Sequence, residues 1–332
     1  MLPILTKKLL ILECKFTPNM NNTNYNIFQN ESPTPWYSLL FMLLIFIAGL
    51  FIGQFLGLLF SIIFTDLTLN ELPELVSLPF TDNKWLPIML IQGIGALGGF
   101  VVAGIVYVML IEKFKWYELF SFKNVKVWTL ILTVVIVVSF MFANTVLIEW
   151  NMNISFPDFM KGFESWARLK EDELKLVTDF ITEFDSLGRF ILGFVVIAII
   201  PAIGEELIFR GILQNKLEVY FKNAHLAIIV SSILFSGFHL QFYGFIPRLL
   251  LGILFGYLYY WSRSLWYPIL AHLINNGLTL IMIYLYQTGR ISLDIESEES
   301  YPANVILIFT MITLYMLYSF WRHYNLKQDT HE

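Results

Sequence analysis

Long apolar runs follow one another through most of this chain. A helix needs roughly 20 mostly apolar residues to cross a bilayer, and runs near this length recur from residue 37 onward. They predict eight transmembrane helices, over residues 37–64, 85–111, 127–148, 189–213, 224–242, 245–261, 265–285 and 303–321. The sixth run is the shortest of the eight. The pattern therefore predicts an all-α, polytopic membrane helix bundle.

The overall composition agrees with a membrane protein. Of the 332 residues, 57% are hydrophobic and only 14% are charged, whereas charged residues make up about a quarter of a soluble domain. The formal net charge is -5 and no block of basic residues occurs, which excludes nucleic acid as a partner. The single cysteine, Cys14, precedes the first apolar run, so an intramolecular disulfide and a cysteine-rich zinc site are excluded as well.

The charged residues between the runs predict the topology, because cytoplasmic connections carry an excess of Lys and Arg. One set of connections, together with the N-terminal segment, is basic: Lys7, Lys8, Lys15, Lys113, Lys115, Lys123, Lys126, Lys216, Lys222 and Arg263. The other set is acidic: Asp66, Glu71, Glu74 and Asp82, the segment from Glu149 to Asp185, and Asp294, Glu296, Glu298 and Glu299. We therefore expect both termini to be cytoplasmic.

The pattern divides the chain into five segments. Residues 1–36 are expected to form a disordered cytoplasmic tail with no secretory signal, and either Met1 or Met20 is the natural start. The first three membrane helices follow in 37–148, an external amphipathic segment in 149–187, a core in 188–285, and the last helix with a cytoplasmic tail in 286–332. No internal repeat is found, so the paired halves typical of many transporters have no support.

Within the external segment, apolar residues recur at helical spacing among acidic ones. This spacing predicts one or two amphipathic helices over residues 157–185. The apolar positions are Phe159, Phe163, Trp166, Leu169, Val177, Phe180 and Phe184. Two interpretations remain open: a helix lying at the outer membrane surface, or a lid over a site within the membrane.

The fourth apolar run contains three ionisable residues, Glu205, Glu206 and Arg210. Such groups cost several kcal/mol at membrane depth, so a cluster of them indicates a functional site. Glu206 and Arg210 are four residues apart with the acid first, which favours an ion pair on one helix face. Glu205 is then the acid without a partner and the candidate general base. Pro201 is expected to kink the helix just before these acids and to open room for water.

Two further runs contribute polar side chains to the same region. The fifth run places Phe235 and His239 on one helix face, and the seventh places His272 and Asn276 on one face. A lone membrane histidine is usually a packing residue, but two histidines in helices that follow an acidic one are a stronger signal. Counted at 1.5 Å per residue from the cytoplasmic helix ends, His239 lies deeper than Glu205 and His272 by roughly 7–10 Å.

The ordered set of motifs resembles a known family. Glu205-Glu206-x-x-x-Arg210, then Phe235-x-x-x-His239, then His272-x-x-x-Asn276, in that order on the fourth, fifth and seventh apolar runs, are similar to the motifs of the CPBP intramembrane proteases. This family includes the CAAX prenyl endopeptidases and the bacterial Abi-type proteins. The resemblance covers about residues 188–285.

This resemblance implies hydrolysis of peptide bonds in a membrane-associated peptide or protein. It implies that Glu205 and His239 activate the attacking water and that His272 and Asn276 stabilise the oxyanion. Glu206 and Arg210 would hold the helix in shape. It also implies an integral protein of a bacterial plasma membrane. The substrate, whether it is prenylated, and the oligomeric state remain open.

The family is described both as metalloproteases and, for its prenyl endopeptidases, as metal-free, glutamate-dependent enzymes. Glu205, His239 and His272 are residue types that would hold zinc or another divalent metal with one open position for water. No His-Glu-x-x-His motif occurs, which excludes a zincin-type helix. Both the metal-dependent and the metal-free mechanism therefore stay open.

Two other functions compete with an enzyme. The chain would be an immunity or scaffold protein of the same family if its polar cluster bound a peptide or partner helix without cleaving it. It would be a proton-coupled transporter if Glu205 were the titrating group. The complete set of catalytic motifs disfavours the scaffold, and the missing repeat disfavours the transporter.

Overall fold

The computed structural model describes residues 35–65, 67–76, 79–292 and 300–325. Nearly all of the predicted N-terminal tail lies outside these ranges, as do Asp66 and the acidic residues Asp294, Glu296, Glu298 and Glu299. The regular elements within the described ranges are all helical.

Each of the eight predicted runs forms a helix or a continuous helical rod. The single helices are α2 (Pro35–Phe64), α6 (Val127–Met152), α11 (Ala224–Phe238), α12 (Phe245–Ser262), α13 (Trp266–Gln287) and α14 (Ala303–Asn325). One rod consists of α3 (Trp85–Ala96), η5 (Leu97–Val102) and α4 (Ala103–Leu110). The other consists of α8 (Leu187–Gly193), η7 (Phe194–Ile199), α9 (Ile200–Glu206), η8 (Leu207–Gln214) and α10 (Asn215–Phe221).

Within the described residues, six of these helical stretches are long and apolar enough to cross a membrane. The two outside this set are α11, which is apolar but short, and α12. The prediction of an all-α, polytopic helix bundle is confirmed.

Shorter helices connect the long ones. They are η3 (Leu69–Val76), η4 (Asp82–Lys84), α5 (Trp116–Leu119), η6 (Asp158–Met160) and α7 (Lys161–Ile181). The segment predicted to hold one or two amphipathic helices thus forms one long helix, α7, preceded by a single short turn. Trp166 and Leu169 of α7 are exposed, as a helix at a membrane surface would require.

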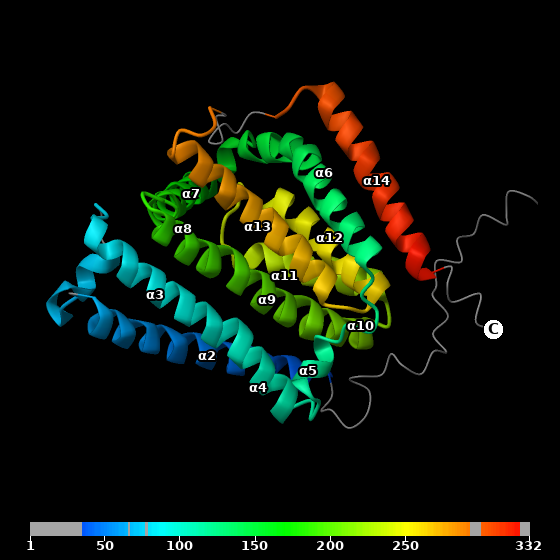
Figure 1. Ribbon diagram of the computed structural model, residues 1–332, viewed down its shortest axis with the longest axis horizontal. Coiled ribbons are helices and arrows are strands. Elements are labelled where there is room, and N and C mark those ends of the chain that lie inside the picture. Colours follow the sequence, from blue (N-terminus) through cyan, green and yellow to red (C-terminus); the bar gives the residue numbers. More distant parts are fainter. Residues whose placement is uncertain (1–34, 66, 77–78, 293–299, 326–332) are drawn as a thin grey trace, which may run out of the picture.

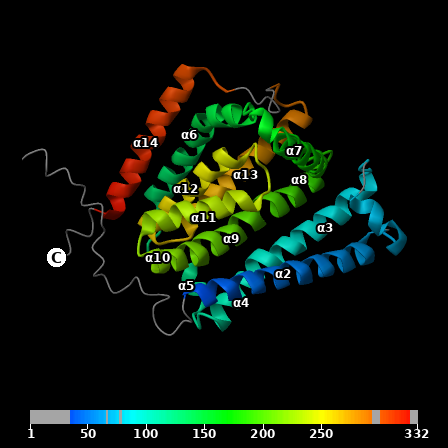
Figure 2. The same cartoon turned by 180° about the vertical axis from the view of Figure 1, so that it is seen from behind.

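The bundle has a helical hairpin at one side and a helix pair at the other (Figure 1). The hairpin is formed by α2 and the α3–α4 rod, and the pair by α6 and α14. Between them lie the α8–α10 rod, α11, α12 and α13, and the same order is seen from behind in Figure 2. The four central elements come from the segment that contains all the predicted site residues.

Small residues allow the hairpin to close. A Cβ added at Gly49 of α2 would lie 2.5 Å from the carbonyl oxygen of Gly98 in η5, so only glycine fits there. Close approach of helix backbones through small residues is a common means of association in membranes, where no hydrophobic effect drives helices together. The hairpin is thereby fixed as one wall of the central cavity.

Candidate active site

The predicted site residues line one large cavity in the middle of the bundle. The cavity has a volume of about 1610 Å³ and mostly apolar walls, built by α2, α3, α6, α7, α9, α12 and α13. Glu205, His239, His272 and Asn276 are all among the lining residues. Glu206 and Arg210 are not; they lie behind the wall. Four side chains from three separate motifs therefore reach one chamber.

Glu205 lies on a short α-helix between two wider helical turns. The rod has π-helical geometry in η7, just before Pro201, and again in η8, just after Glu206. Such interruptions occur often at functional sites because they re-aim side chains. Glu205 is 8% exposed, and its Oε2 is buried with no hydrogen-bond partner among the described residues.

Glu206 connects two other site residues behind the cavity wall. Arg210 Nη1 donates to Glu206 Oε1 at 2.8 Å, and His272 Nδ1 lies 2.8 Å from the same oxygen. Because a carboxylate oxygen accepts, His272 donates from Nδ1 and only its Nε2 is left for other partners. The Glu206 side chain is fully buried and that of Arg210 almost so.

The same group is packed between aromatic rings and is tied to a neighbouring helix. Arg210 lies 4.5 Å from the ring centre of Phe235, and His272 stacks on Phe255 with ring centres 5.5 Å apart. Arg210 Nη2 also donates to the carbonyl oxygen of Gly252 in α12. These contacts join η8, α11, α12 and α13 around one buried ion pair, which fixes the position of His272.

His239 follows the last residue of α11. The helix ends here because Leu240 adopts a left-handed backbone with φ of 55°, which is uncommon for a residue other than glycine. His239 Nδ1 lies 2.9 Å from the carbonyl oxygen of Phe235. A carbonyl only accepts, so Nδ1 carries the proton and Nε2 keeps its lone pair.

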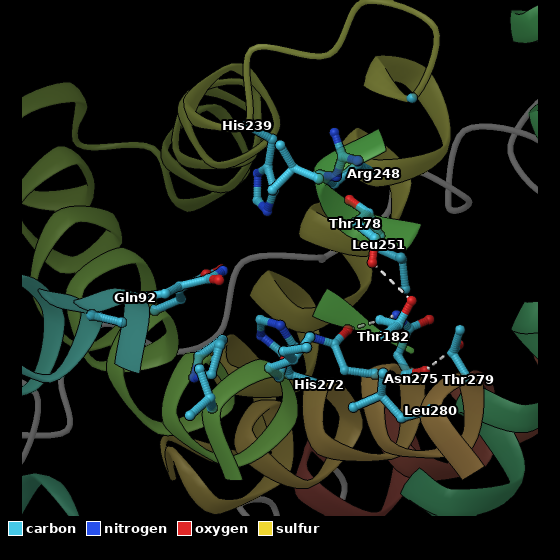
Figure 3. A pocket seen from close by; sticks show the side chains of 18 of the residues that line it. Gln92, Thr178, Thr182, His239, Arg248, Leu251, His272, Asn275, Thr279 and Leu280 are labelled. Atoms are coloured by element: carbon cyan, nitrogen blue, oxygen red, sulfur yellow. Dashed lines mark hydrogen bonds between the residues drawn. The ribbon is translucent and has the colours of Figure 1, made fainter. Parts of the chain in front are cut away.

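The two histidines share an aromatic neighbour despite their unequal expected depths. The ring centre of Phe235 lies 5.4 Å from that of His239 and 6.0 Å from that of His272. In Figure 3, His239 and Arg248 lie across the cavity from His272 and Asn275.

Asn276 is placed by the proline that precedes the acids. Pro201 has no N–H, so it cannot donate to the carbonyl of Ile197 four residues earlier. Asn276 Nδ2 donates to that carbonyl oxygen at 3.2 Å, and Asn275 Nδ2 donates to Asn276 Oδ1 at 3.1 Å. One amide hydrogen of Asn276 is thus engaged by the α8–α10 rod, and the other remains for a ligand.

The residues proposed for a metal do not form a compact ligand group. Among the described residues, no three His, Cys, Asp or Glu side chains lie close enough together to hold a metal ion. Phe235 lies against both histidines, and His272 Nδ1 is committed to Glu206. In this arrangement Glu205, His239 and His272 do not fit a three-ligand metal site.

The structure adds residues to the site that the motifs did not indicate. Arg248 of α12 and Glu171 of α7 line the same cavity, as do Thr178 of α7 and Thr182, which directly follows α7. Arg248 is an ionisable residue inside an apolar run, which is the signal that identified Glu205, so the sequence did contain a pointer to it. Helix α7 has an exposed apolar face and also covers part of the cavity, so both open interpretations of this segment have structural support.

Residues 187–278 match the Rce1-like family. The family model is described as type II CAAX prenyl endopeptidase Rce1-like, and the Rce1-like region runs from α8 into α13 and includes all the predicted site residues. The resemblance to the CAAX prenyl endopeptidases is thereby confirmed.

A curated relative matches part of the chain. It is "Putative membrane peptidase YdiL" of Bacillus subtilis (strain 168), which is 35% identical over 95 residues. The aligned stretch is 27% of this chain, and the chain spans 37% of the length of that relative. No solved structure matches. The apolar helices and the Rce1-like region together make this chain an integral membrane protein.

Proposed function

We propose that this protein is an intramembrane endopeptidase that hydrolyses a peptide bond of a membrane-associated peptide or protein. The observation that carries the proposal is the meeting of Glu205, His239, His272 and Asn276 at one cavity. The Rce1-like region and the relative described as a membrane peptidase support a membrane protease at the level of the family.

In this proposal, Glu205 and His239 activate the attacking water. Glu205 Oε2 has no hydrogen-bond partner among the described residues, so the Glu205 carboxylate can take a proton from water as the water oxygen attacks the peptide carbonyl. His239 Nε2, left with its lone pair by the bond from Nδ1 to Phe235, accepts a hydrogen bond from that water and orients it. The proton then passes to the leaving amine when the carbon–nitrogen bond breaks.

In this proposal, His272 and Asn276 stabilise the oxyanion. Because His272 Nδ1 donates to Glu206, its Nε2 donates to the oxyanion only when the ring is doubly protonated. The Glu206 carboxylate beside Nδ1 offsets part of that positive charge, because the same oxygen also pairs with Arg210. Asn276 supplies its second amide hydrogen. Each donor of this kind contributes roughly 3–4 kcal/mol to transition-state stabilisation.

Substrate access is proposed from the side of the acidic connections. Leu72, Leu75 and Phe80 from the segment before α3, and Tyr301 before α14, line the cavity. None of the lining residues comes from the lysine-rich connections 111–126, 214–223 and 262–265. With those connections in the cytoplasm, the cavity opens toward the external side.

The test is cleavage of a library of membrane peptides by purified protein in vesicles. Wild type is expected to cleave a subset, Glu205→Gln none, and Glu218→Gln the same subset as wild type. Glu218 pairs with Arg263 and does not line the cavity, which makes it a matched control. Normal cleavage by Glu205→Gln would refute the assignment of the base, and binding without cleavage by wild type would favour the scaffold function.

A further inference from the structure

Arg248 places a guanidinium in the cavity wall. It is the fourth residue of α12 and lies on the same side of the chamber as His239 (Figure 3). Glu205 also lines this chamber. The mechanism proposed above gives Arg248 no role.

The hydrogen bonds of Arg248 hold it with one nitrogen free. Its Nη2 donates to Gln241 Oε1 at 2.8 Å, and Gln241 Nε2 in turn donates to Glu171 Oε1 at 3.1 Å. Its Nη1 is buried and has no hydrogen-bond partner among the described residues. The neutral amide of Gln241, itself held by Glu171 of α7, therefore fixes the guanidinium, and Nη1 keeps its donor capacity unused among the described residues.

Arg248 differs in this respect from the other arginines that are at least partly buried in the described ranges. Arg189, Arg210 and Arg263 each lie within 4.0 Å of a carboxylate oxygen, whereas Arg248 has no such ion pair there. The charges of Glu171 and Glu205 act on it only over a longer distance. A cation that is partly shielded from water and has no directly paired anion is costly, which points to a ligand that supplies the anion.

We propose that Arg248 binds a carboxylate of the peptide substrate and thereby sets which bond reaches Glu205; this rests on the proposed function. The planar guanidinium presents parallel N–H donors that match the two oxygens of a carboxylate. Glu205 repels that anion and so keeps it on the Arg248 side of the cavity. The carboxylate is either the C-terminal one or an Asp or Glu side chain.

Peptide binding to a catalytically inactive protein tests this assignment without requiring turnover. Glu205→Gln protein in neutral-lipid vesicles is titrated with one apolar peptide in three forms: a C-terminal acid, a C-terminal amide, and an amide with one internal Glu. A charge-assisted hydrogen bond predicts that a carboxylate form binds about 10- to 100-fold tighter than the uncharged amide. The form that shows the preference identifies which carboxylate is recognised.

The second arm adds Arg248→Gln. The preference for a carboxylate should disappear, so that all three peptides bind like the uncharged amide. Arg248→Lys should keep a part of the preference, because lysine keeps the positive charge but lacks the two parallel N–H donors of the guanidinium. The matched control is Arg168→Gln, which removes an exposed charge from α7 outside the cavity lining and should leave the preference intact.

Three results would overturn the proposal. The first is an undiminished preference in Arg248→Gln. The second concerns Arg248→Gln in otherwise wild-type protein. If this variant loses turnover equally on acid and amide peptides and its pH profile shifts, Arg248 acts through Glu205 instead. The third is a loss of binding to vesicles containing phosphatidylglycerol rather than to peptides, which would make the ligand a lipid phosphate. Carboxylate-selective binding by protein that cleaves nothing would refute the protease and leave the Arg248 site standing.

Discussion

His272 Nδ1 lies 2.8 Å from Glu206 Oε1, and this oxygen also accepts the hydrogen bond from Arg210 Nη1. A single carboxylate oxygen thus connects the buried ion pair of the α8–α10 rod to a histidine of α13. The four-residue spacing in the sequence pairs Glu206 with Arg210 alone. The contact from α13 gives Glu206 a second partner, His272, which lines the cavity.

Glu206→Gln should lower both stability and turnover. Removing one partner of a buried ion pair leaves Arg210 uncompensated, at a cost of about 3–5 kcal/mol, and it removes the group that orients His272. Thermal unfolding in detergent and single-substrate kinetics measure the two effects. Glu218→Gln breaks a more exposed pair and should cost less than about 1 kcal/mol. A melting temperature for Glu206→Gln that equals that of wild type would contradict this prediction.

Asn276→Ala should reduce kcat far more than it changes KM, because an oxyanion donor acts mainly in the transition state. Loss of one such donor reduces the rate by about 10²–10³-fold. Asn275→Ala is the matched control, since Asn275 lines the same cavity and contacts Asn276 but has no proposed catalytic role. A change confined to KM would make Asn276 a binding residue instead.

The topology is tested with single cysteines in a protein whose Cys14 has been replaced. The excess of lysine predicts that Lys123→Cys is cytoplasmic, and the acidic segment predicts that Asp172→Cys in α7 is external. Both positions are exposed in the structure. An impermeant thiol reagent added to intact cells should label only the second. Labelling of both cysteines, or only of the first, would refute the predicted orientation.

Dependence on a metal is tested by elemental analysis together with chelation. A metal-free mechanism through Glu205 and His239 predicts full activity in protein from which zinc has been removed. His239→Ala should then lose activity without any change in metal content, whereas His225→Ala, whose histidine does not line the cavity, should remain active. Stoichiometric zinc that is lost together with activity, and lost again in His239→Ala, would establish the metal mechanism instead.

The sequence by itself determined the helices and the segment that carries the site. Apolar runs near the thickness of a bilayer leave few alternatives to helices, since backbone N–H and C=O groups in lipid must be satisfied within the segment. Each of the eight predicted runs accordingly became a helix or helical rod. Local spacing was also sufficient where both partners lie on one helix, as for Glu206 and Arg210.

Tertiary structure decided the contacts between helices. The bond between His272 and Glu206 joins residues 66 apart, and that between Asn276 and Ile197 joins residues 79 apart. The spacing of residues within one helix carries no information about contacts between residues so far apart in the sequence. Counting along straight helices also gave His239 a greater depth than His272, because it takes no account of tilt or of the position where α11 ends.

Arg248 shows the same limit. Its place in an apolar run marked it as unusual, but the sequence did not reveal its contact with Gln241, the bond from Gln241 to α7, or the cavity that it shares with Glu205. These depend on how α7, α9 and α12 pack, and packing depends on the shapes of side chains that are distant in sequence. The sequence thus determined which groups are costly to bury, and the tertiary structure decided which of them meet.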